Sequence, residues 1–441
     1  MKLKRFYLAA ACLTALPLSA QQQWTLEKCI DYAIEHNLQI KQQEATKEQN
    51  EIEVNTAKWS RLPNLNGSTS YSFNFGRSLQ ADNTYESLNT QSNNFSLNTN
   101  VPLFTGMQIP NNIALAKLNL KAAVEDLAKA KEDISIQVAS SYLQVLFNQE
   151  LAKVAHEQVA LSEEMLKQKT AFFENGKASE AELYEAKARL AQDRLSAVQA
   201  DNNYSLALLD LSQLLELPTP EGFSIVSPDI DSLQLFDRLS TPEEIYAQAL
   251  QIKPGIKAAQ YRLEGAQKNI RLAQSAFYPQ LSFGAGIATN YYRVSGYENS
   301  SYSSQLRDNF SQYLGFTLNV PIFNRFSTRN NVRKARVQKN LLSWQLEDSK
   351  KTLYKEIQQA YYNAVTAESK YTSSQTADEA AKASFDLMEQ KYLNGKANGT
   401  EYNEARTIWL KAVSDRIQAK YDYLFRTKIL DFYKGIPLTL K

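Results

Sequence analysis

Two pairs of glutamates are the polar residues whose spacing is most suggestive of chemistry. Glu182 and Glu185 form the first pair, and Glu401 and Glu404 form the second. A spacing of three residues places both carboxylates of a pair on one face of a helix. Carboxylates gathered around a pore attract cations and repel one another, so protonation or a binding partner would loosen such a ring. The alternative is that they are solvated charges on a helix surface.

The same four-residue turn precedes each pair. Asn-Gly-Lys-Ala occurs at 175–178 and again at 394–397. Its glycine follows a long segment without glycine or proline, as a glycine that ends a helix and reverses the chain does. The sequence therefore predicts two helical hairpins, with Gly176 and Lys177 at one tip and Gly395 and Lys396 at the other. The lysines either contact a partner there or only solubilise the tip.

Catalysis, cofactors and metals have little support in the sequence. Its two histidines, His36 and His156, lie in predicted helices, away from any cysteine or carboxylate cluster with metal-ligand spacing. Neither a glycine-rich phosphate loop nor a nucleophile elbow occurs. We therefore expect no enzymatic activity, no cofactor and no metal, and we interpret both histidines as exposed polar residues.

The charge balance argues against a nucleic-acid binder, and the amino-terminus predicts export. The 49 basic and 47 acidic residues leave a formal charge of +2, without the basic face that phosphate recognition needs. A basic start at 2–5, an apolar run at 6–18 and small residues up to Ala20 have the order of a signal peptide, predicted as 1–20. Lipidation at Cys12 is a weaker alternative.

Cleavage after the signal would leave one thiol, Cys29. A single cysteine cannot form an internal disulfide, and its apolar helical surroundings favour a small buried hydrophobic residue over a reactive nucleophile. No later apolar run reaches the length of about 18 residues that a spanning helix needs. The sequence therefore predicts an exported protein without a transmembrane helix.

The chain repeats itself at a nearly constant offset. Residues 101–104 (Val-Pro-Leu-Phe) match 320–323 (Val-Pro-Ile-Phe), and both tip turns match, at an offset of 219 (320 − 101). Upstream matches such as Pro63 with Pro279 have an offset of 216 (279 − 63), and a loop between strands can absorb the difference. We predict a tandem duplication: signal peptide 1–20, first repeat 21–217, linker 218–240, second repeat 241–437 and tail 438–441.

Each repeat contains a segment that would form a very long helix. No glycine or proline occurs between Asn111 and Asn175, and a helix of those 65 residues would be roughly 98 Å long. Such a helix needs support along its side, and apolar residues with heptad spacing indicate coiled-coil packing. The seam is Ile113, Ala116, Leu120, Ala123, Leu127, Ala130 and Ile134, matched by Val332, Ala335, Lys339, Leu342, Leu346, Ser349 and Leu353.

Four segments alternate between apolar residues and small polar residues, near 65–75, 94–104, 281–291 and 310–322. Each is long enough for the 9 to 11 residues of a tilted transmembrane strand. Uncharged polar residues opposite apolar and aromatic ones fit a barrel with lipid outside and a wet lumen. Half-buried soluble hairpins are the alternative.

Four strands cannot close a membrane barrel, because the smallest such barrels have eight. An open edge in lipid would leave backbone groups without hydrogen-bond partners. The predicted barrel must therefore be shared between chains. Three chains would supply twelve strands, whereas two would supply eight and leave little lumen.

Taken together, these features resemble the TolC family of outer-membrane efflux and secretion ducts, from about Trp24 to Pro437. The resemblance depends on the signal peptide, the duplicated helix–strand–strand–helix–helix unit, the strand ends at 101–104 and 320–323, and the paired Asn-Gly-Lys-Ala turns. The resemblance implies a mainly α fold with a small β part: a homotrimer with a 12-stranded β-barrel in the outer membrane of a Gram-negative bacterium and a long periplasmic α-barrel. The linker 218–240 would lie near the middle of that α-barrel.

The resemblance also implies roles for the tips. The tips would meet a periplasmic adaptor protein and an inner-membrane pump of the RND or ABC type. Glu401 and Glu404 would constrict the periplasmic entrance, and Tyr392 matches a tyrosine of that gate. This chain has glutamate where the family usually has aspartate, and it has Ala-Asn-Gly at 397–399 where the family can carry an arginine.

We therefore predict a passive exit duct of a tripartite multidrug efflux system. Type I protein secretion uses the same fold and is the first alternative, because substrate choice lies largely in the pump. A structural periplasmic coiled-coil protein is the second, and it would be soluble without detergent. A stand-alone porin is the third, although a porin needs no helices of this length.

Overall fold

The computed structural model describes residues 23–79, 83–227 and 240–439. The predicted signal peptide, Cys12 and most of the linker lie outside these residues. The described chain divides into two compact units. The first unit contains residues 23–43, 127–254 and 350–439, and the second contains 44–126 and 255–349.

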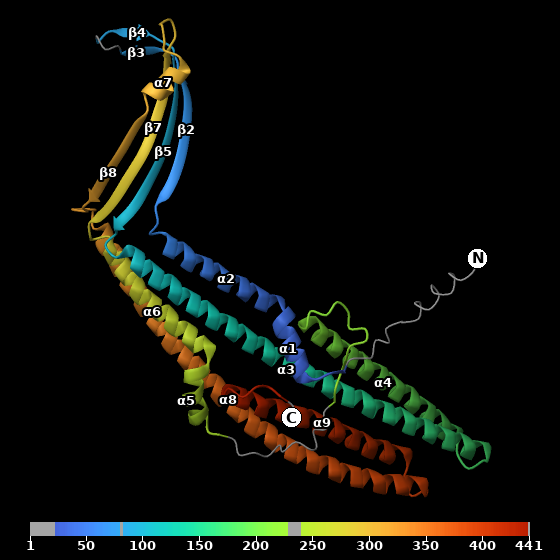
Figure 1. Ribbon diagram of the computed structural model, residues 1–441. Coiled ribbons are helices and arrows are strands. Elements are labelled where there is room, and N and C mark those ends of the chain that lie inside the picture. Colours follow the sequence, from blue (N-terminus) through green and yellow to red (C-terminus); the bar gives the residue numbers. More distant parts are fainter. Residues whose placement is uncertain (1–22, 80–82, 228–239, 440–441) are drawn as a thin grey trace, which may run out of the picture. The chain divides into compact units, whose positions relative to one another are not determined.

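The second unit contains one four-stranded antiparallel sheet in the order β2-β5-β7-β8, whose strands lie side by side in Figure 1. These strands are β2 (Asn64–Asn74), β5 (Thr90–Phe104), β7 (Gln280–Val294) and β8 (Ser311–Asn319). All four predicted strands are therefore present. The last one ends at Asn319, three residues before its predicted end, and Pro321 beyond it has no amide to donate to a ladder.

The register places the alternating residues on two chemically distinct faces. Leu97 lies opposite Gly67 on β2 and Ile287 on β7, so the apolar positions of neighbouring strands share one face. On the other face the hydroxyls of Ser68 and Ser96 lie 2.7 Å apart. Among the described strands, β2 and β8 each pair with a single neighbour, so the sheet has two open edges.

Three elements around this sheet were not predicted. A small hairpin of β3 (Arg77–Leu79) and β4 (Tyr85–Ser87) lies between β2 and β5 in the sequence. The short helix α7 (Tyr302–Asp308) precedes β8 and packs on β7. The Gln305 side chain accepts from the Tyr292 amide (2.9 Å) and donates to its carbonyl (3.0 Å), so it replaces a ladder partner beyond the end of β8.

Two helices of 67 residues, α3 (Gln108–Glu174) and α8 (Ser327–Leu393), run through both units. In the second unit, the predicted seam of α3 packs on α2 (Leu38–Trp59). Ala116 is buried with Val54 and Ala57, and Ile113 and Leu120 pack against them. The heptad spacing therefore predicted the packing face of α3 correctly, whereas its partner α2 was not predicted. Helix α6 (Pro254–Ser275) also packs on α3.

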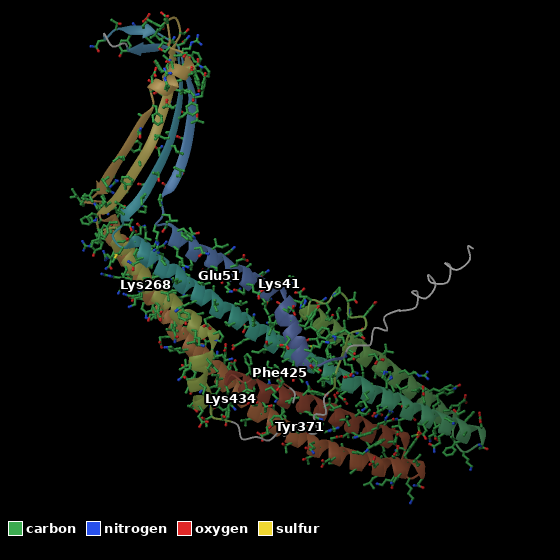
Figure 2. The ribbon with its side chains drawn as sticks, in the orientation of Figure 1. Lys41, Glu51, Lys268, Tyr371, Phe425 and Lys434 are labelled. Carbon is green, nitrogen blue, oxygen red and sulfur yellow. The ribbon has the colours of Figure 1, made fainter. Side chains whose placement is uncertain are left out.

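The first unit contains two helical hairpins, α3 with α4 and α8 with α9 (Figure 1). Tyr371 of α8, labelled in Figure 2, stacks on Tyr423 of α9 with ring centroids 6.1 Å apart. The second helix of each hairpin is α4 (Glu180–Leu214) or α9 (Gly399–Tyr433), and the other elements of the unit are α1 (Leu26–His36), α5 (Pro242–Ile252), β1 (Gln23–Trp24) and β6 (Ser224–Ile225). Part of the predicted linker thus forms a strand, which pairs in parallel with the strand before α1.

A buried tyrosine joins this small sheet to α3. The Tyr142 hydroxyl lies 2.6 Å from the Val226 carbonyl and 3.1 Å from the Trp24 carbonyl, so it donates at the point where β1 and β6 meet. Burial raises the pKa of this hydroxyl, and the nearby Cys29 and Glu27 raise it further, so the hydroxyl stays protonated. Its ring belongs to the main apolar core of the unit.

The cysteine and histidine predictions have different outcomes. Cys29 is fully buried, and burial raises the pKa of its thiol to about 12, as expected for an inert hydrophobic residue. His156 is exposed and lies 2.9 Å from the Asp201 carboxylate. The prediction was wrong for His36, which is half-buried because its ring stacks on Tyr32 within α1. Within the described residues, no helix combines the length and apolar character needed to cross a membrane.

Candidate functional site at the hairpin tips

Both hairpin tips are built in the same way. Gly176 and Gly395 adopt positive φ angles of 68° and 69°, a conformation that costs glycine little. The following lysine amides reach back to the helix: Lys177 donates to the Phe172 carbonyl and Lys396 to the Lys391 carbonyl, each over 2.8 Å. This bond across six residues is the Schellman arrangement that ends a helix at glycine. The lysine side chains are exposed.

The residues that begin the return helices differ in type but act alike. Ser179 precedes α4 and accepts from the Glu182 amide (3.3 Å), and Asn398 precedes α9 and accepts from the Glu401 amide (2.9 Å). The Glu401 carboxylate in turn accepts from the Asn398 amide (3.0 Å). Serine and asparagine are both good amino-terminal caps. The sequence difference between the tips therefore leaves their backbone unchanged.

The first glutamate of each pair already has a hydrogen-bond or ion-pair partner within the chain. Glu401 completes a capping box, which is a structural role. The Glu182 carboxylate lies 2.7 Å from the Lys169 ammonium, whose nitrogen lies 4.5 Å from the centre of the Tyr392 ring. The hydrogen bond from Lys169 lowers the pKa of Glu182. Burial acts to lower the pKa of Lys169, but its hydrogen bonds to Glu182 and Tyr392 raise it overall.

The second members differ from each other. The Glu185 carboxylate accepts from the Asn403 side chain across the two hairpins (3.0 Å) and lies against Gly399. Glu404, its counterpart in the second repeat, is exposed. The structure therefore brings together Glu182, Glu185 and Tyr392, but the four glutamates do not form one equivalent set within a chain.

These side chains surround a cavity of about 30 Å³ between the hairpins, with Tyr392 and Tyr402 on one side and Glu185 on the other. That volume has room for about one or two water molecules. Among the described residues, no group of three or more histidine, cysteine or acidic side chains could hold a metal ion. This cavity is therefore too small for an organic ligand, and the contact around it is polar.

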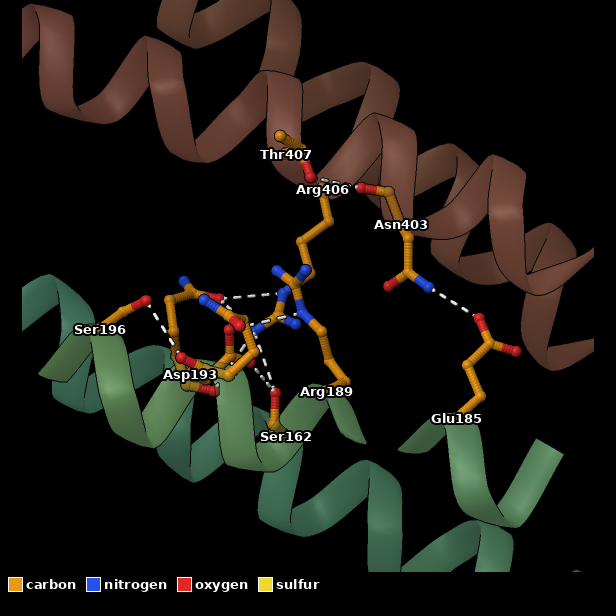
Figure 3. Close-up of polar contacts among 10 residues, drawn as sticks. Ser162, Glu185, Arg189, Asp193, Ser196, Asn403, Arg406 and Thr407 are labelled. Carbon is orange, nitrogen blue, oxygen red and sulfur yellow. Dashed lines mark hydrogen bonds and ion pairs between the residues drawn. The ribbon is translucent and has the colours of Figure 1, made fainter. Parts of the chain in front are cut away.

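A buried arginine behind the tips was not predicted from the sequence. Arg406 of α9 is only 2% exposed. Its guanidinium donates to the Gln158 side chain (2.8 Å) and the Ser162 hydroxyl (3.1 Å) on α3, and to the Asp193 carboxylate (2.9 Å) on α4 (Figure 3). Ser162 also donates to Asp193. Four polar side chains from three helices thus satisfy one another, which offsets the cost of burying a charge.

One weak signal of this network is present in the sequence. Arg406 follows Glu404 closely and lies on the apolar side of α9, where Tyr402 and Val413 are also buried. A cation at such a position needs a buried partner. The partner could not be identified from the sequence, because Asp193 is 213 residues away.

Comparison with known proteins defines the class of protein to which this fold and these tips belong. The profile described as "Outer membrane efflux protein" matches residues 29–216 and 245–432. The chain therefore belongs to the outer membrane efflux protein family. This membership confirms the resemblance inferred from the sequence, including the outer-membrane localisation and the efflux function.

Individual relatives are distant but extend over most of the chain. The Outer membrane efflux protein BepC of Brucella suis is 21% identical over 425 residues, covering 95% of this chain and 87% of that protein. The Outer membrane protein TolC of Vibrio cholerae is 23% identical, covering 84% and 81%. The crystal structure of the Campylobacter jejuni CmeC outer membrane channel has a TM-score of 0.78 at 21% identity, covering 93% and 85%. This structural likeness confirms the predicted fold class.

Proposed function

We propose that three copies of this chain form a passive exit duct in the outer membrane, which receives substrates from an inner-membrane pump through a periplasmic adaptor. Each copy contributes two homologous repeats, 21–217 and 241–437, and therefore two hairpin tips and four strands. The duct performs no catalytic step. Family membership supports the efflux role, and the open sheet edges support assembly from several copies.

The observation that carries this proposal is the sheet of the second unit. Its apolar face joins Leu97 and Ile287 to exposed aromatic residues such as Phe316 and Phe73. Its opposite face is lined by serine and asparagine side chains that hydrogen-bond to one another, as Ser68 and Ser96 do. Lipid suits the first face and water the second. Pairing β2 of one copy with β8 of the next satisfies both open edges and closes the barrel.

The hairpin tips are the proposed contact with the adaptor and the site of the gate. Gly176 and Gly395 fix two turns of the same shape, and Lys177 and Lys396 are exposed at their ends. Glu182, Glu185, Tyr392, Glu401 and Glu404 form the proposed gate region. Because Glu401 caps a helix and Glu404 is exposed, Glu404 is the member best placed to act on ions in the opening.

The assembly is tested by the mass of the protein extracted from outer membranes in detergent. A trimer that forms pores in planar bilayers is expected. A monomer, or a particle much shorter than about 100 Å, would contradict the proposal, because a helix of 67 residues sets that length. Complementation of a strain that lacks its efflux duct, compared with one that lacks its protein-secretion duct, then separates the two uses of the fold.

The gate is tested by conductance of two single variants. Glu404→Gln is expected to reduce cation selectivity and block by divalent cations, because it removes an exposed carboxylate from each copy. Glu401→Gln is the matched control, since glutamine can keep the capping bond while removing the same charge. If neither variant, nor the two combined, changes conductance or cation block, the gate assignment is wrong.

A further inference from the structure

The four strands of the large sheet contain a single charged residue. Arg293, near the end of β7, is exposed, whereas β2, β5 and β8 contain no aspartate, glutamate, lysine or arginine. Among the described residues, its guanidinium has no hydrogen-bond or ion-pair partner. A charge on the lipid face of a barrel strand is costly at the middle of the bilayer and is tolerated near its surfaces. The face and the depth of Arg293 therefore decide what it can bind.

Arg293 lies on the apolar face of the sheet. The register places it opposite Gln91 of β5, which lies opposite Phe73 of β2 on its other side. Residues that are directly opposite each other share a face. Arg293 also follows Ile287 by an even number of residues, so the two side chains point to the same side of β7. This is the face that we assigned to lipid.

Arg293 lies at the outer end of that face. Strand β7 begins beside the carboxyl end of α6, and Arg293 follows Leu281 by 12 residues (293 − 281). At about 3.4 Å per residue and a tilt of about 40°, this separation crosses about 30 Å, the thickness of the hydrocarbon core. The helical part of this family extends into the periplasm. Arg293 is therefore at the level of the lipid headgroups in the outer leaflet.

An aromatic layer and then an apolar hollow follow below Arg293 on the same face. Tyr291 packs on Tyr302 of α7 with ring centroids 4.8 Å apart, and Asn93, opposite Tyr291, donates to the Tyr302 hydroxyl (3.0 Å). Helix α7 lies beside the outer part of β7 in Figure 1. The hollow comes next and has a volume of about 370 Å³, within the range of ligand pockets. Its lining includes Gly67, Phe95, Leu97, Ile287, Thr289 and Phe310.

We propose that this face binds a phosphorylated, acylated lipid of the outer leaflet, with a phosphate on Arg293 and an acyl chain in the hollow. The proposal rests on the proposed duct, because it requires the sheet to lie in the outer membrane. An arginine presents a planar fork of donors that matches a phosphate group. Four residues, or about 13 Å, separate Arg293 from Thr289 at the hollow. One leaflet is about 15 Å deep, so a single lipid reaches both.

A membrane lipid fits this face better than a free anion does. One exposed arginine gains little from an ion pair in water, so it would hold inorganic phosphate only weakly. Arg307 of α7 adds no second free cation, because its guanidinium lies 3.1 Å from the Asp308 carboxylate. A lipid combines the attraction of its phosphate with burial of its chain against the apolar face, and both contribute to binding.

The headgroup contact is tested by native mass spectrometry of the detergent-extracted trimer, titrated with bis-phosphorylated lipid A and with lipid A stripped of its phosphates. The natural protein should bind the phosphorylated form about tenfold more tightly, the effect of one hydrogen bond to a charged group. Arg293→Gln should bind both forms equally. Arg293→Lys should keep part of the preference, because an ammonium cannot bind in a bidentate manner. Arg307→Gln is the matched control and should keep the full preference.

The hollow is tested by filling it. A Cβ atom at Gly67 would lie 3.6 Å from Leu97, an ordinary contact, so a leucine fits there and extends into the hollow. Gly67→Leu should weaken the binding of both forms of lipid A and leave their ratio unchanged. Gly315→Leu is the matched control, since this glycine of β8 lies opposite Gly284 on the polar face and has open space around it. It should leave both affinities unchanged.

The outcomes separate the lipid site from the duct. A trimer that forms pores but binds both forms of lipid A equally, or that keeps its preference in Arg293→Gln, overturns the site and leaves the duct standing. If inorganic phosphate displaces the lipid and Gly67→Leu has no effect, the face holds only an anion and the proposal is wrong. A protein that stays monomeric and forms no pores overturns the duct and the lipid site with it.

Discussion

Replacing Arg406 with methionine should be among the most destabilising single changes in the helical hairpins. The substitution keeps an unbranched apolar side chain in the space but removes every hydrogen bond that the guanidinium makes to α3 and α4. The Asp193 side chain, 7% exposed, then loses its nearest buried cation. An uncompensated charge at such a site is the main source of the expected loss.

The magnitude follows from what Asp193 keeps. Breaking a buried ion pair by removing one partner costs about 3–5 kcal/mol. Here Ser162 still donates to the carboxylate, and the Arg189 guanidinium lies 3.4 Å from its other oxygen. These contacts keep Asp193 partly satisfied, so we expect a loss near the lower limit, about 3 kcal/mol in the free energy of unfolding.

The assay is guanidinium unfolding of the detergent-solubilised protein, followed by far-ultraviolet circular dichroism and repeated from the unfolded side to establish reversibility. Lys187→Met is the matched control, since it removes a cation at the equivalent, exposed position of the first repeat and should change the free energy by less than about 0.5 kcal/mol. Arg406→Met combined with Asp193→Leu removes both charges and should recover at least about 1 kcal/mol relative to the single variant.

Two results would refute the reasoning. If Arg406→Met and Lys187→Met have the same small effect, the network contributes little to stability despite its burial. If the stability lost in the double variant Arg406→Met with Asp193→Leu equals the sum of the losses of the two single variants, the cost does not come from an unpaired carboxylate.

Three further predictions concern other contacts of the first unit. Tyr142→Phe should cost about 1–3 kcal/mol of unfolding free energy, because the Val226 carbonyl loses the hydroxyl donor that lies 2.6 Å away, while the Trp24 carbonyl keeps the Val226 amide as its donor. Tyr361→Phe at the equivalent position should cost clearly less in the same titration, and equal losses would contradict the role assigned to the hydroxyl. Lys253→Met should cost about 1–3 kcal/mol of unfolding free energy, since the buried Lys253 ammonium donates to the Phe432 carbonyl at the carboxyl end of α9 (3.2 Å). An unchanged thermal stability would show that burying this cation is as costly as its contacts are favourable. The pKa of Glu182 is lowered, so its ion pair with Lys169 stabilises the tip fully above pH 4.5 and is lost as pH falls through the lower pKa of the folded state; the raised pKa of Lys169 preserves the pair up to at least pH 10.5. Amide exchange in the first turn of α4 should therefore accelerate at acidic pH. Glu182→Gln should abolish that acid dependence.

Much of the fold could be predicted because its signals are local or periodic. The absence of glycine and proline between Asn111 and Asn175 permits one long helix. Gly176 and Gly395 each follow such a segment, and a glycine at that position commonly ends a helix. Alternation along Leu65–Phe75 defines a strand with two faces without reference to its neighbours. The internal duplication then gave each of these predictions an independent second observation.

The elements that were missed depend on contacts made in three dimensions. Helix α7 has no strong periodicity of its own and is placed by Gln305 and Thr289 along the part of β7 that extends beyond the first residue of β8. The sequence predicted Glu182 as a gate carboxylate or a solvated helix-face charge and did not predict its ion pair, because its partner Lys169 lies on the preceding helix and reaches it only once the hairpin has closed. A pairing between separate helices leaves no regular spacing in the sequence.

By itself, the sequence determined the duplication, the length of the helices, the chemistry of the two sheet faces and the turns at the tips, because each follows from backbone preferences and short-range periodicity. Only the tertiary structure decided which of the candidate residues do structural work. It assigned Glu401 to a helix cap, Glu182 to an ion pair and Glu185 to a contact between hairpins, and left Glu404 exposed. It also revealed Arg406 and Asp193, 213 residues apart, as partners, because burial in a shared interface is what makes a charge require a partner.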